Sequence, residues 1–175
     1  MPHVLAPITV FDPDGGAHRL GELWAEHPAV LVFVRHFGCL FCRQQVAELA
    51  PMADAIRARG ARLAIIGQGS VEDARVFRAE QQLTVPLFTD PARDAYCAMQ
   101  MRSGTRTVIG PRVLRRAWTA WRQGFRQTRP AGDPFQQGGV VIIDTAGAER
   151  YAFISRDAGD HPTPADILAA LGDLA

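Results

Sequence analysis

Two cysteines with two residues between them are the side chains best suited to chemistry in this sequence. Cys39 and Cys42 enclose Leu40 and Phe41, and they closely follow the apolar run of residues 29–34. When positions i and i+3 lie at the start of a helix, their side chains share one face and the two sulfur atoms can meet. Such a pair can exchange between dithiol and disulfide, or it can supply two ligands of a metal ion.

Three interpretations of this pair have to be weighed. A structural zinc ion needs about four ligands, whereas beyond the pair the sequence offers His36 nearby and His161 far along the chain. The cysteines could also be inert core residues, because a free thiol packs as a small apolar group. We favour redox chemistry, since a C-x-x-C motif within a strand–helix–strand pattern is typical of a thiol redox site.

The environment predicted for the pair favours a thiolate at Cys39. A helix N-terminus carries partial positive charge and unpaired N–H groups, and both stabilise the thiolate, which is the nucleophilic form. Arg35, His36 and Arg43 lie next to the pair in sequence, where positive charge would lower a thiol pKa further. We therefore expect an exposed Cys39 to attack the substrate and a more buried Cys42, one turn later, to resolve the intermediate.

Composition and charge narrow the function classes. The chain has 175 residues, 47% of them hydrophobic, and a formal net charge of +1. These values predict one globular domain over residues 1–175 and give no indication of a nucleic-acid partner. All nineteen basic residues are arginine, which excludes an active-site lysine. We find neither a secretory signal at the start nor a run of ~20 apolar residues, so we expect a cytoplasmic protein without membrane insertion.

The alternation of apolar and polar residues predicts the elements that position the pair. Predicted strands cover residues 8–11, 17–20, 29–34, 61–67, 85–88, 139–144 and 149–154. Predicted helices cover residues 40–59, 71–82, 90–101 and 164–174. This order is typical of an α/β fold with a central mixed sheet flanked by helices, parallel in its early part and antiparallel in the late hairpin.

Single residues predict local features of these elements. Pro51 should kink the long helix that begins after the pair. Ser70 should cap the next helix, with Asp73 completing a capping box. Pro86 cannot donate to a strand ladder, so its strand is expected to lie at the edge of the sheet at best.

The segment from residue 30 to residue 43 (VLVFVRHFGCLFCR) resembles the peroxiredoxin-like branch of the alkyl hydroperoxide reductase and thiol-specific antioxidant superfamily. Further segments similar to that branch lie at residues 67–70, 89–91, 132–134, 138–140 and 158–162. The resemblance extends over roughly residues 5 to 172, which is most of the chain.

This resemblance carries implications for fold and activity. It implies a thioredoxin-like fold in which Cys39 and Cys42 form the redox centre, with no metal or organic cofactor. It implies a thiol oxidoreductase that reduces a small peroxide, endoperoxide or disulfide and is regenerated by an external dithiol of the thioredoxin or glutaredoxin type. Some eukaryotic members reduce prostaglandin-type endoperoxides and others are described only as antioxidant proteins. The resemblance also allows a homodimer.

At several positions of the site the sequence differs from peroxiredoxins and thioredoxin. Peroxiredoxins carry Pro-x-x-x-Thr-x-x-Cys here, so Arg35 takes the Pro place, Cys39 the Thr place and Cys42 the place of the peroxide-attacking cysteine. This alignment leaves open which cysteine attacks first. Gly138 stands near the place of a peroxiredoxin arginine, and Gly138 and Gly139 stand where thioredoxin has a cis-proline. We expect both glycines at the thiolate or substrate side of the site, and inefficient hydrogen peroxide reduction by the usual mechanism.

An arginine-rich insertion at about residues 102–137 precedes the late hairpin. It contains eight arginines, and no acidic residue occurs between positions 94 and 133. Its helical part, at about residues 111–125, carries Trp118, Trp121 and Phe125 at helical spacing. We expect the aromatic side chains to pack on the sheet and the arginines to be solvated. The alternatives are an acidic ligand or partner, or a membrane surface. If the cysteines were unreactive, the chain would be a non-catalytic binding module that uses this insertion.

Two further residues have simpler interpretations than chemistry. Cys97 falls on a predicted helix, where we interpret it as an ordinary helix residue rather than a resolving cysteine. His161 follows Asp160 in a Gly-Asp-His-Pro turn that could lie at the same end of the fold as the cysteines. Such a turn more often caps the following helix.

Overall fold

The computed structural model describes residues 3–104, 111–126, 128 and 131–172. Within this part of the chain, seven strands form a mixed sheet in the order β2-β1-β5-β4-β3-β6-β7. Their bounds are β1 Thr9–Phe11, β2 Ala17–Arg19, β3 Ala29–Phe33, β4 Arg62–Gly67, β5 Leu87–Thr89, β6 Gly139–Ile143 and β7 Glu149–Ile154. β3, β4 and β5 run parallel, and the other neighbours pair antiparallel. The predicted central mixed sheet is therefore confirmed.

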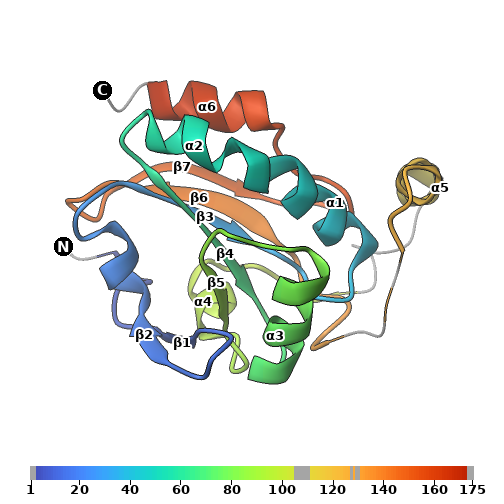
Figure 1. Ribbon diagram of the computed structural model, residues 1–175, viewed down its shortest axis with the longest axis horizontal. Coiled ribbons are helices and arrows are strands. Elements are labelled where there is room, and N and C mark those ends of the chain that lie inside the picture. Colours follow the sequence, from blue (N-terminus) through green and yellow to red (C-terminus); the bar gives the residue numbers. More distant parts are fainter. Residues whose placement is uncertain (1–2, 105–110, 127, 129–130, 173–175) are drawn as a thin grey trace.

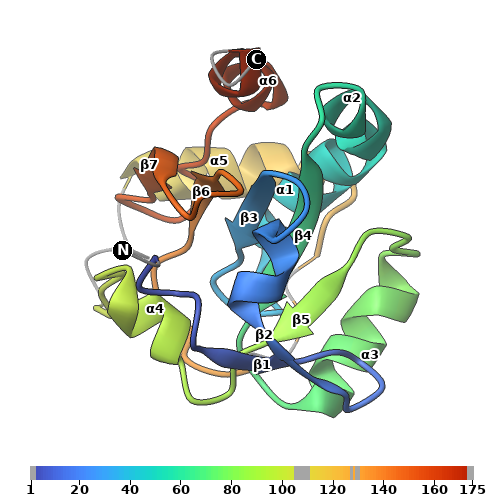
Figure 2. The same ribbon diagram turned by 90° about the vertical axis from the view of Figure 1, so that its left-hand side faces the viewer.

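Helices cover both faces of this sheet (Figures 1 and 2). They are α1 Leu40–Leu49, α2 Ala53–Arg57, α3 Val71–Glu80, α4 Asp94–Ala98, α5 Pro111–Arg122 and α6 Pro164–Gly172, with 3₁₀ turns η1 Leu20–Trp24 and η2 Ala50–Met52. Helices α1, α2, α3, α5 and α6 pack over the face that presents Val30 and Val32. η1 and α4 pack over the opposite face, which presents Leu31 and Phe33.

Strand β3 holds the central position that directs the cysteine pair. It lies between β4 and β6, and all five of its residues are buried. Because both faces of the sheet are covered, an unbroken apolar run is required here rather than an alternating one. The chain leaves the end of β3 through a short loop and enters α1 at Leu40, so the pair lies at this edge of the sheet.

Two local predictions are confirmed. The long helix after the pair is interrupted at Pro51, where η2 separates α1 from α2. Ser70 caps α3: its hydroxyl accepts from the backbone N–H of Asp73, and the Asp73 carboxylate accepts from the N–H of Ser70 at 2.8 Å. The capping box fixes where α3 begins.

The strand around Pro86 was predicted wrongly. β5 lies inside the sheet, between β1 and β4, rather than at its edge. Pro86 stands just before the strand, where its missing N–H costs nothing and its carbonyl accepts from Ile65 N–H at 2.9 Å. The helix predicted for residues 90–101 is also shorter, because α4 begins only at Asp94.

The arginine-rich insertion contains α5. The expectation that its aromatic side chains pack on the sheet is wrong for the two tryptophans of this helix. Val113, Ala117 and Ala120 face the core, and α5 packs on α1. Trp118 and Trp121 lie exposed on another side of the helix, whereas Phe125, which follows the helix, packs against the core as expected. Among the described residues, no helix combines the length and apolarity needed to cross a bilayer.

Candidate active site

Both cysteines of the pair are buried where the loop after β3 meets α1. Cys39 is the N-cap residue of α1 with φ −72° and ψ 123°, and Cys42 lies one turn into the helix. The exposed fraction of Cys39 is 4% and that of Cys42 is 2%. The prediction that Cys39 would be exposed is therefore wrong, although its place at the very start of the helix is as expected.

Neighbouring segments provide this cover. Phe37, just before the pair, packs its ring against Phe77 of α3 with centroids 5.0 Å apart. Leu40 and Phe41, between the two cysteines, are buried as well. Thr128 lies against the loop, and its N–H donates to the carbonyl of Gly38 at 3.1 Å. The spacing of residues in the sequence does not predict that such distant segments bury the two cysteines.

The two thiols have opposite pKa shifts. Hydrogen bonding from the Cys42 side chain, together with the N–H groups of Cys42 and Phe41 and the charge of Arg35, outweighs burial and lowers the pKa of Cys39 to about 7. Neither N–H forms a regular capping bond to the sulfur. Burial, first of all, raises the pKa of Cys42 well above its usual value. Near neutral pH the lowered pKa therefore favours the thiolate at Cys39, and the raised pKa keeps Cys42 protonated.

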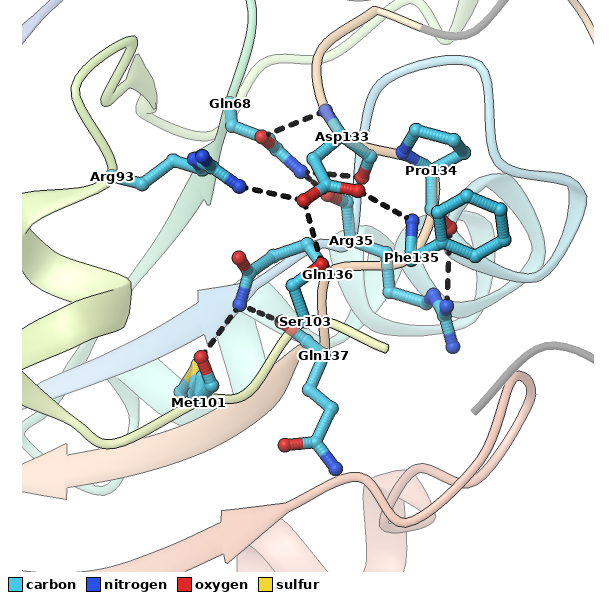
Figure 3. Close-up of polar contacts among 10 residues, drawn as sticks. All are labelled: Arg35, Gln68, Arg93, Met101, Ser103, Asp133, Pro134, Phe135, Gln136 and Gln137. Carbon is cyan, nitrogen blue, oxygen red and sulfur yellow. Dashed lines mark hydrogen bonds and ion pairs between the residues drawn. The ribbon is translucent and has the colours of Figure 1, made fainter. Parts of the chain in front are cut away.

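Arg35 contacts the pair through its backbone and its charge. Its N–H donates to Cys42 Sγ at 3.2 Å. Its side chain reaches the segment before β6, where Nη2 donates to the carbonyl of Pro134 at 3.2 Å (Figure 3). Arg35 thus bonds Cys42 through its backbone, favours the Cys39 thiolate through its charge, and joins their loop to the segment that precedes β6.

A polar network holds this loop in place (Figure 3). Gln68 Nε2, after β4, donates to the carbonyls of Arg35 at 2.5 Å and Asp133 at 2.8 Å. The Asp133 carboxylate in turn accepts from Arg93 Nη1 and Ser103 Oγ, both at 2.7 Å. In the sequence, the segments at residues 67–70 and 132–134 stand out only by their similarity to the peroxiredoxin-like branch. No feature of the sequence indicates that these segments meet at Arg35.

His36 does not supply the charge expected of it. Its side chain is buried, and burial together with the charge of Arg35 lowers its pKa to about 4. The imidazole is therefore neutral at pH 7 and adds no positive charge beside the thiols. Among the described residues, its Nδ1 has no hydrogen-bond partner.

Arg43 is directed away from the sulfur atoms, contrary to expectation. Its guanidinium forms an ion pair with Glu80 of α3. It also donates to Thr128 Oγ1 at 3.3 Å and lies over the Phe77 ring at 5.7 Å. Arg43 lies on the side of α1 that faces α3. Glu80 compensates its charge there, and its side chain packs on Phe77.

Gly138 and Gly139 allow close approach of three strands beside the pair. A Cβ at Gly138 would collide with the carbonyl oxygen of Phe33 and lie 3.4 Å from the N atom of Arg35. A Cβ at Gly139 would collide with the carbonyl oxygen of Phe153. These glycines are thus positioned to let β6 approach β3 and β7, and Gly138 touches the residue that bonds Cys42.

A narrow cavity of about 10 Å³ lies over Cys42 and is lined by Gly138, Phe41 and His161, among others. The Gly-Asp-His-Pro turn therefore does lie at the cysteine end. His161 Nε2 is 3.6 Å from the Glu48 carboxylate, and burial lowers the pKa of the imidazole. The following helix is capped by Thr163 instead, whose hydroxyl accepts from the N–H of Asp166 at 3.2 Å.

Two larger cavities flank the cysteine loop. One, of about 280 Å³, begins on the other side of Phe41 and is lined by Arg115, Arg116 and His161. The other, of about 230 Å³, is lined by Phe37 and Gly38 together with residues of α3. The first cavity shares Phe41 and His161 with the narrow cavity over Cys42.

Other parts of the structure lie apart from the pair. A cavity of about 750 Å³ is lined by His27, Leu63 and Pro86 at the start of the parallel strands and contains neither cysteine. Cys97 is exposed on α4, over the opposite face of the sheet. Among the described residues, no three His, Cys, Asp or Glu side chains come together to hold a metal ion.

Comparison of the sequence with known proteins gives consistent similarities. A family model described as AhpC/TSA antioxidant enzyme matches residues 48–157, a range that begins after the cysteine pair. The chain is 31% identical to "Thioredoxin-like protein AAED1, chloroplastic" of Arabidopsis thaliana, over 95% of this chain and 71% of the plant protein. It is 28% identical to "Peroxiredoxin-like 2C" of Homo sapiens, over 96% and 79% respectively. It is also 28% identical to "Prostamide/prostaglandin F synthase" of Danio rerio, over 88% and 79%.

Solved structures show the same fold at low sequence identity. The chain superposes on peroxidoxin BcpB of Mycobacterium tuberculosis with a TM-score of 0.71 and 16% identity, covering 96% of this chain and 93% of that one. It superposes on a cysteine-to-serine mutant of PrxQ of Xylella fastidiosa with a TM-score of 0.68 and 14% identity, covering 99% and 91%. This likeness confirms the predicted thioredoxin-like fold.

Proposed function

Because the chain belongs to the AhpC/TSA antioxidant enzyme family and has a thioredoxin-like fold, we propose that it is a thiol-dependent peroxide reductase whose redox pair is Cys39 and Cys42. The observation that carries the proposal is the placement of the pair: Cys39 is the N-cap residue of α1, and Cys42, one turn later, accepts from the N–H of Arg35 at 3.2 Å. A helix N-terminus stabilises a thiolate at Cys39, in agreement with the lowered pKa of that thiol, and Cys42 is near enough to close a disulfide with it.

The reaction proceeds in two steps at the pair. The Cys39 thiolate attacks one oxygen of the peroxide bond, which breaks and leaves an alkoxide that takes up a proton as alcohol. Cys39 is then a sulfenic acid, or a sulfenate ester if the substrate is an endoperoxide. Cys42 then loses its proton as its sulfur attacks that of Cys39 and the S–O bond breaks. The departing oxygen takes up a proton and leaves as water or as the second alcohol, and the Cys39–Cys42 disulfide forms. An external dithiol returns the pair to the reduced state by thiol–disulfide exchange.

The surroundings of the pair support an apolar organic peroxide as substrate rather than hydrogen peroxide. Leu40 and Phe41 fill the centre of the motif, and Gly138 brings no side chain to the site. Relatives named prostamide/prostaglandin F synthase support an endoperoxide as one member of this class. We place the reaction in a reducing compartment, the cytoplasm, where a thioredoxin- or glutaredoxin-like dithiol is available.

A second candidate function rests on the burial of both cysteines. A pair that no substrate reaches would leave a thioredoxin-fold binding module, with the arginine-rich insertion as its contact surface. The two functions differ in one observable, which is conversion of the pair to a disulfide by an oxidant.

Oxidation of the reduced protein separates these functions and ranks the substrates. We expect an equimolar organic hydroperoxide or endoperoxide to form the Cys39–Cys42 disulfide at least ~10-fold faster than hydrogen peroxide, because the centre of the motif is apolar. The measurement is rapid acid quenching followed by peptide mass mapping, with the exposed Cys97 as internal reference. If every oxidant modifies Cys97 and leaves the pair reduced, the peroxidase proposal fails and the binding module takes its place.

A further inference from the structure

Three large apolar side chains of α5 are exposed on one face of the helix. Leu114 is 70% exposed, Trp118 59% and Trp121 55%. Their spacing of four and three residues places them on one stripe, which we call the tryptophan face. Helix α5 stands at the periphery of the molecule in Figure 1, so this stripe is open to whatever approaches that side.

The tryptophan face is held firmly by the rest of α5. Val113 and Ala120 on the other side of the helix are buried in the main core, and Ala117 packs against it. Arg116 Nη1 is 2.6 Å from the Asp157 carboxylate after β7, which fixes the rotation of the helix. The tryptophans are therefore presented outward by a packed helix. Exposed apolar side chains gathered in this way mark interaction surfaces.

Arginines accompany both tryptophans. The Arg122 guanidinium lies 4.8 Å from the Trp118 ring centroid, and that of Arg126 lies 4.9 Å from the Trp121 ring. No acidic residue occurs in sequence between positions 94 and 133. The face is thus apolar at its centre and positively charged around it, so a complementary partner carries negative charge next to apolar material.

We propose that the tryptophan face of α5 docks the protein onto membranes that contain anionic lipids. Indole rings favour the headgroup level of a bilayer and arginines pair with lipid phosphates. Trp118 and Trp121, more than half exposed, stand out from the surface as lipid-inserting side chains must. A second copy of this face would bring arginines against arginines, which charge repulsion opposes.

Docking in this orientation would place α5 between the lipid and the cysteine loop. α5 packs on α1, which begins directly after Cys39, and Thr128, just beyond α5, contacts the cysteine loop at Gly38. The docking itself requires no redox chemistry, so it goes beyond the proposed function and stands independently of it.

Vesicle binding tests this inference. The full chain is mixed with vesicles of phosphatidylcholine alone, or with vesicles in which phosphatidylglycerol replaces a third of it, and binding is measured by sedimentation. We expect binding to the anionic vesicles only, weakened by salt because exposed charges are screened. Tryptophan fluorescence should shift to the blue and be quenched by brominated lipid. Buried Trp24 provides a constant background.

Variants assign the binding to this face. Trp118→Ala/Trp121→Ala and Arg122→Gln/Arg126→Gln should each lower the vesicle partition coefficient by about tenfold or more, through lost apolar burial and lost charge respectively. Arg57→Gln/Arg59→Gln, at the end of α2 and just after it, removes the same charge from a distant surface and should change the partition coefficient less than about twofold.

Two results would overturn the inference. One is the absence of binding to anionic vesicles at low salt, which would leave an acidic protein as the partner of the face. The other is binding that both α5 variants retain. A Cys39→Ser/Cys42→Ser variant should bind vesicles as the wild type does, so failure of the redox proposal would not be mistaken for failure of docking.

Discussion

Replacing Cys39 by serine is expected to lower kcat/KM for organic peroxide reduction by a factor of roughly 10³ or more, the scale of losing a catalytic nucleophile. Cys39 carries the thiol with the lowered pKa, about 7, and a serine hydroxyl forms no comparable nucleophile at neutral pH. The measurement is steady-state turnover with an excess of dithiol reductant. Unfolding by urea should show that the variant keeps its fold.

The corresponding change at Cys42 separates attack from resolution. Cys42→Ser should keep one attack per molecule and then stop, with a sulfenic acid on Cys39 that dimedone captures. Its hydroxyl can still donate a hydrogen bond to the Cys39 sulfur. Cys42→Ala removes that donor, which is the largest cause of the lowered pKa, and should raise the pKa of Cys39.

The control for both changes is Cys97→Ser. Cys97 is exposed on α4 and far from the pair in the fold, so turnover should stay within about twofold of the wild type. The assignment would be reversed if Cys42→Ser lost the first attack and Cys39→Ser kept it. That outcome would favour the peroxiredoxin alignment, in which Cys42 attacks.

Replacing Gly138 by alanine is expected to lower the free energy of unfolding by about 2–3 kcal/mol, the upper range for forcing an extra methyl group into a packed site. The added Cβ would meet the carbonyl oxygen of Phe33 and the backbone of Arg35. Neither is the end of a flexible side chain, so β3 or β6 would have to move. Urea unfolding measures the loss.

The same change should also disturb the pair. Arg35 N–H donates to Cys42 Sγ, so displacement of Arg35 should slow closure of the Cys39–Cys42 disulfide. Gly104→Ala is the matched control, because a Cβ there meets nothing within 4 Å. Equal stability of the two variants would show that Gly138 does not determine the approach of β6 to β3.

Local sequence signals predict much of this fold because the features they describe are local. The apolar run at β3, the capping box at Ser70 and the interruption at Pro51 each depend on neighbouring residues. The position of β5 could not be predicted in the same way. Pro86 is unfavourable inside a strand, but the strand begins one residue later and its partners β1 and β4 come from distant parts of the chain.

Sequence also identified the cysteine pair, but not the environment that surrounds it. The burial of Cys39 and the pairing of Arg43 with Glu80 depend on segments that fold back from α3 and from beyond α5. The network of Gln68 and Asp133 joins residues 65 positions apart. A charged residue near a cysteine in sequence is thus a weak guide to the pKa of the thiol. Tertiary contacts decide where the charged side chain points and how far the thiol is buried.

The pH dependence of alkylation of the reduced protein tests most directly whether Cys39 and Cys42 form an activated redox pair. Since only the thiolate reacts, the alkylation rate at Cys39, followed by mass mapping, should rise with pH and level off above about 7. Alkylation of Cys42 should begin only at strongly alkaline pH, because burial raises its pKa. If both cysteines titrate near the ordinary value of ~8.5, or if Cys42 reacts first, the assignment of Cys39 as the activated nucleophile is contradicted.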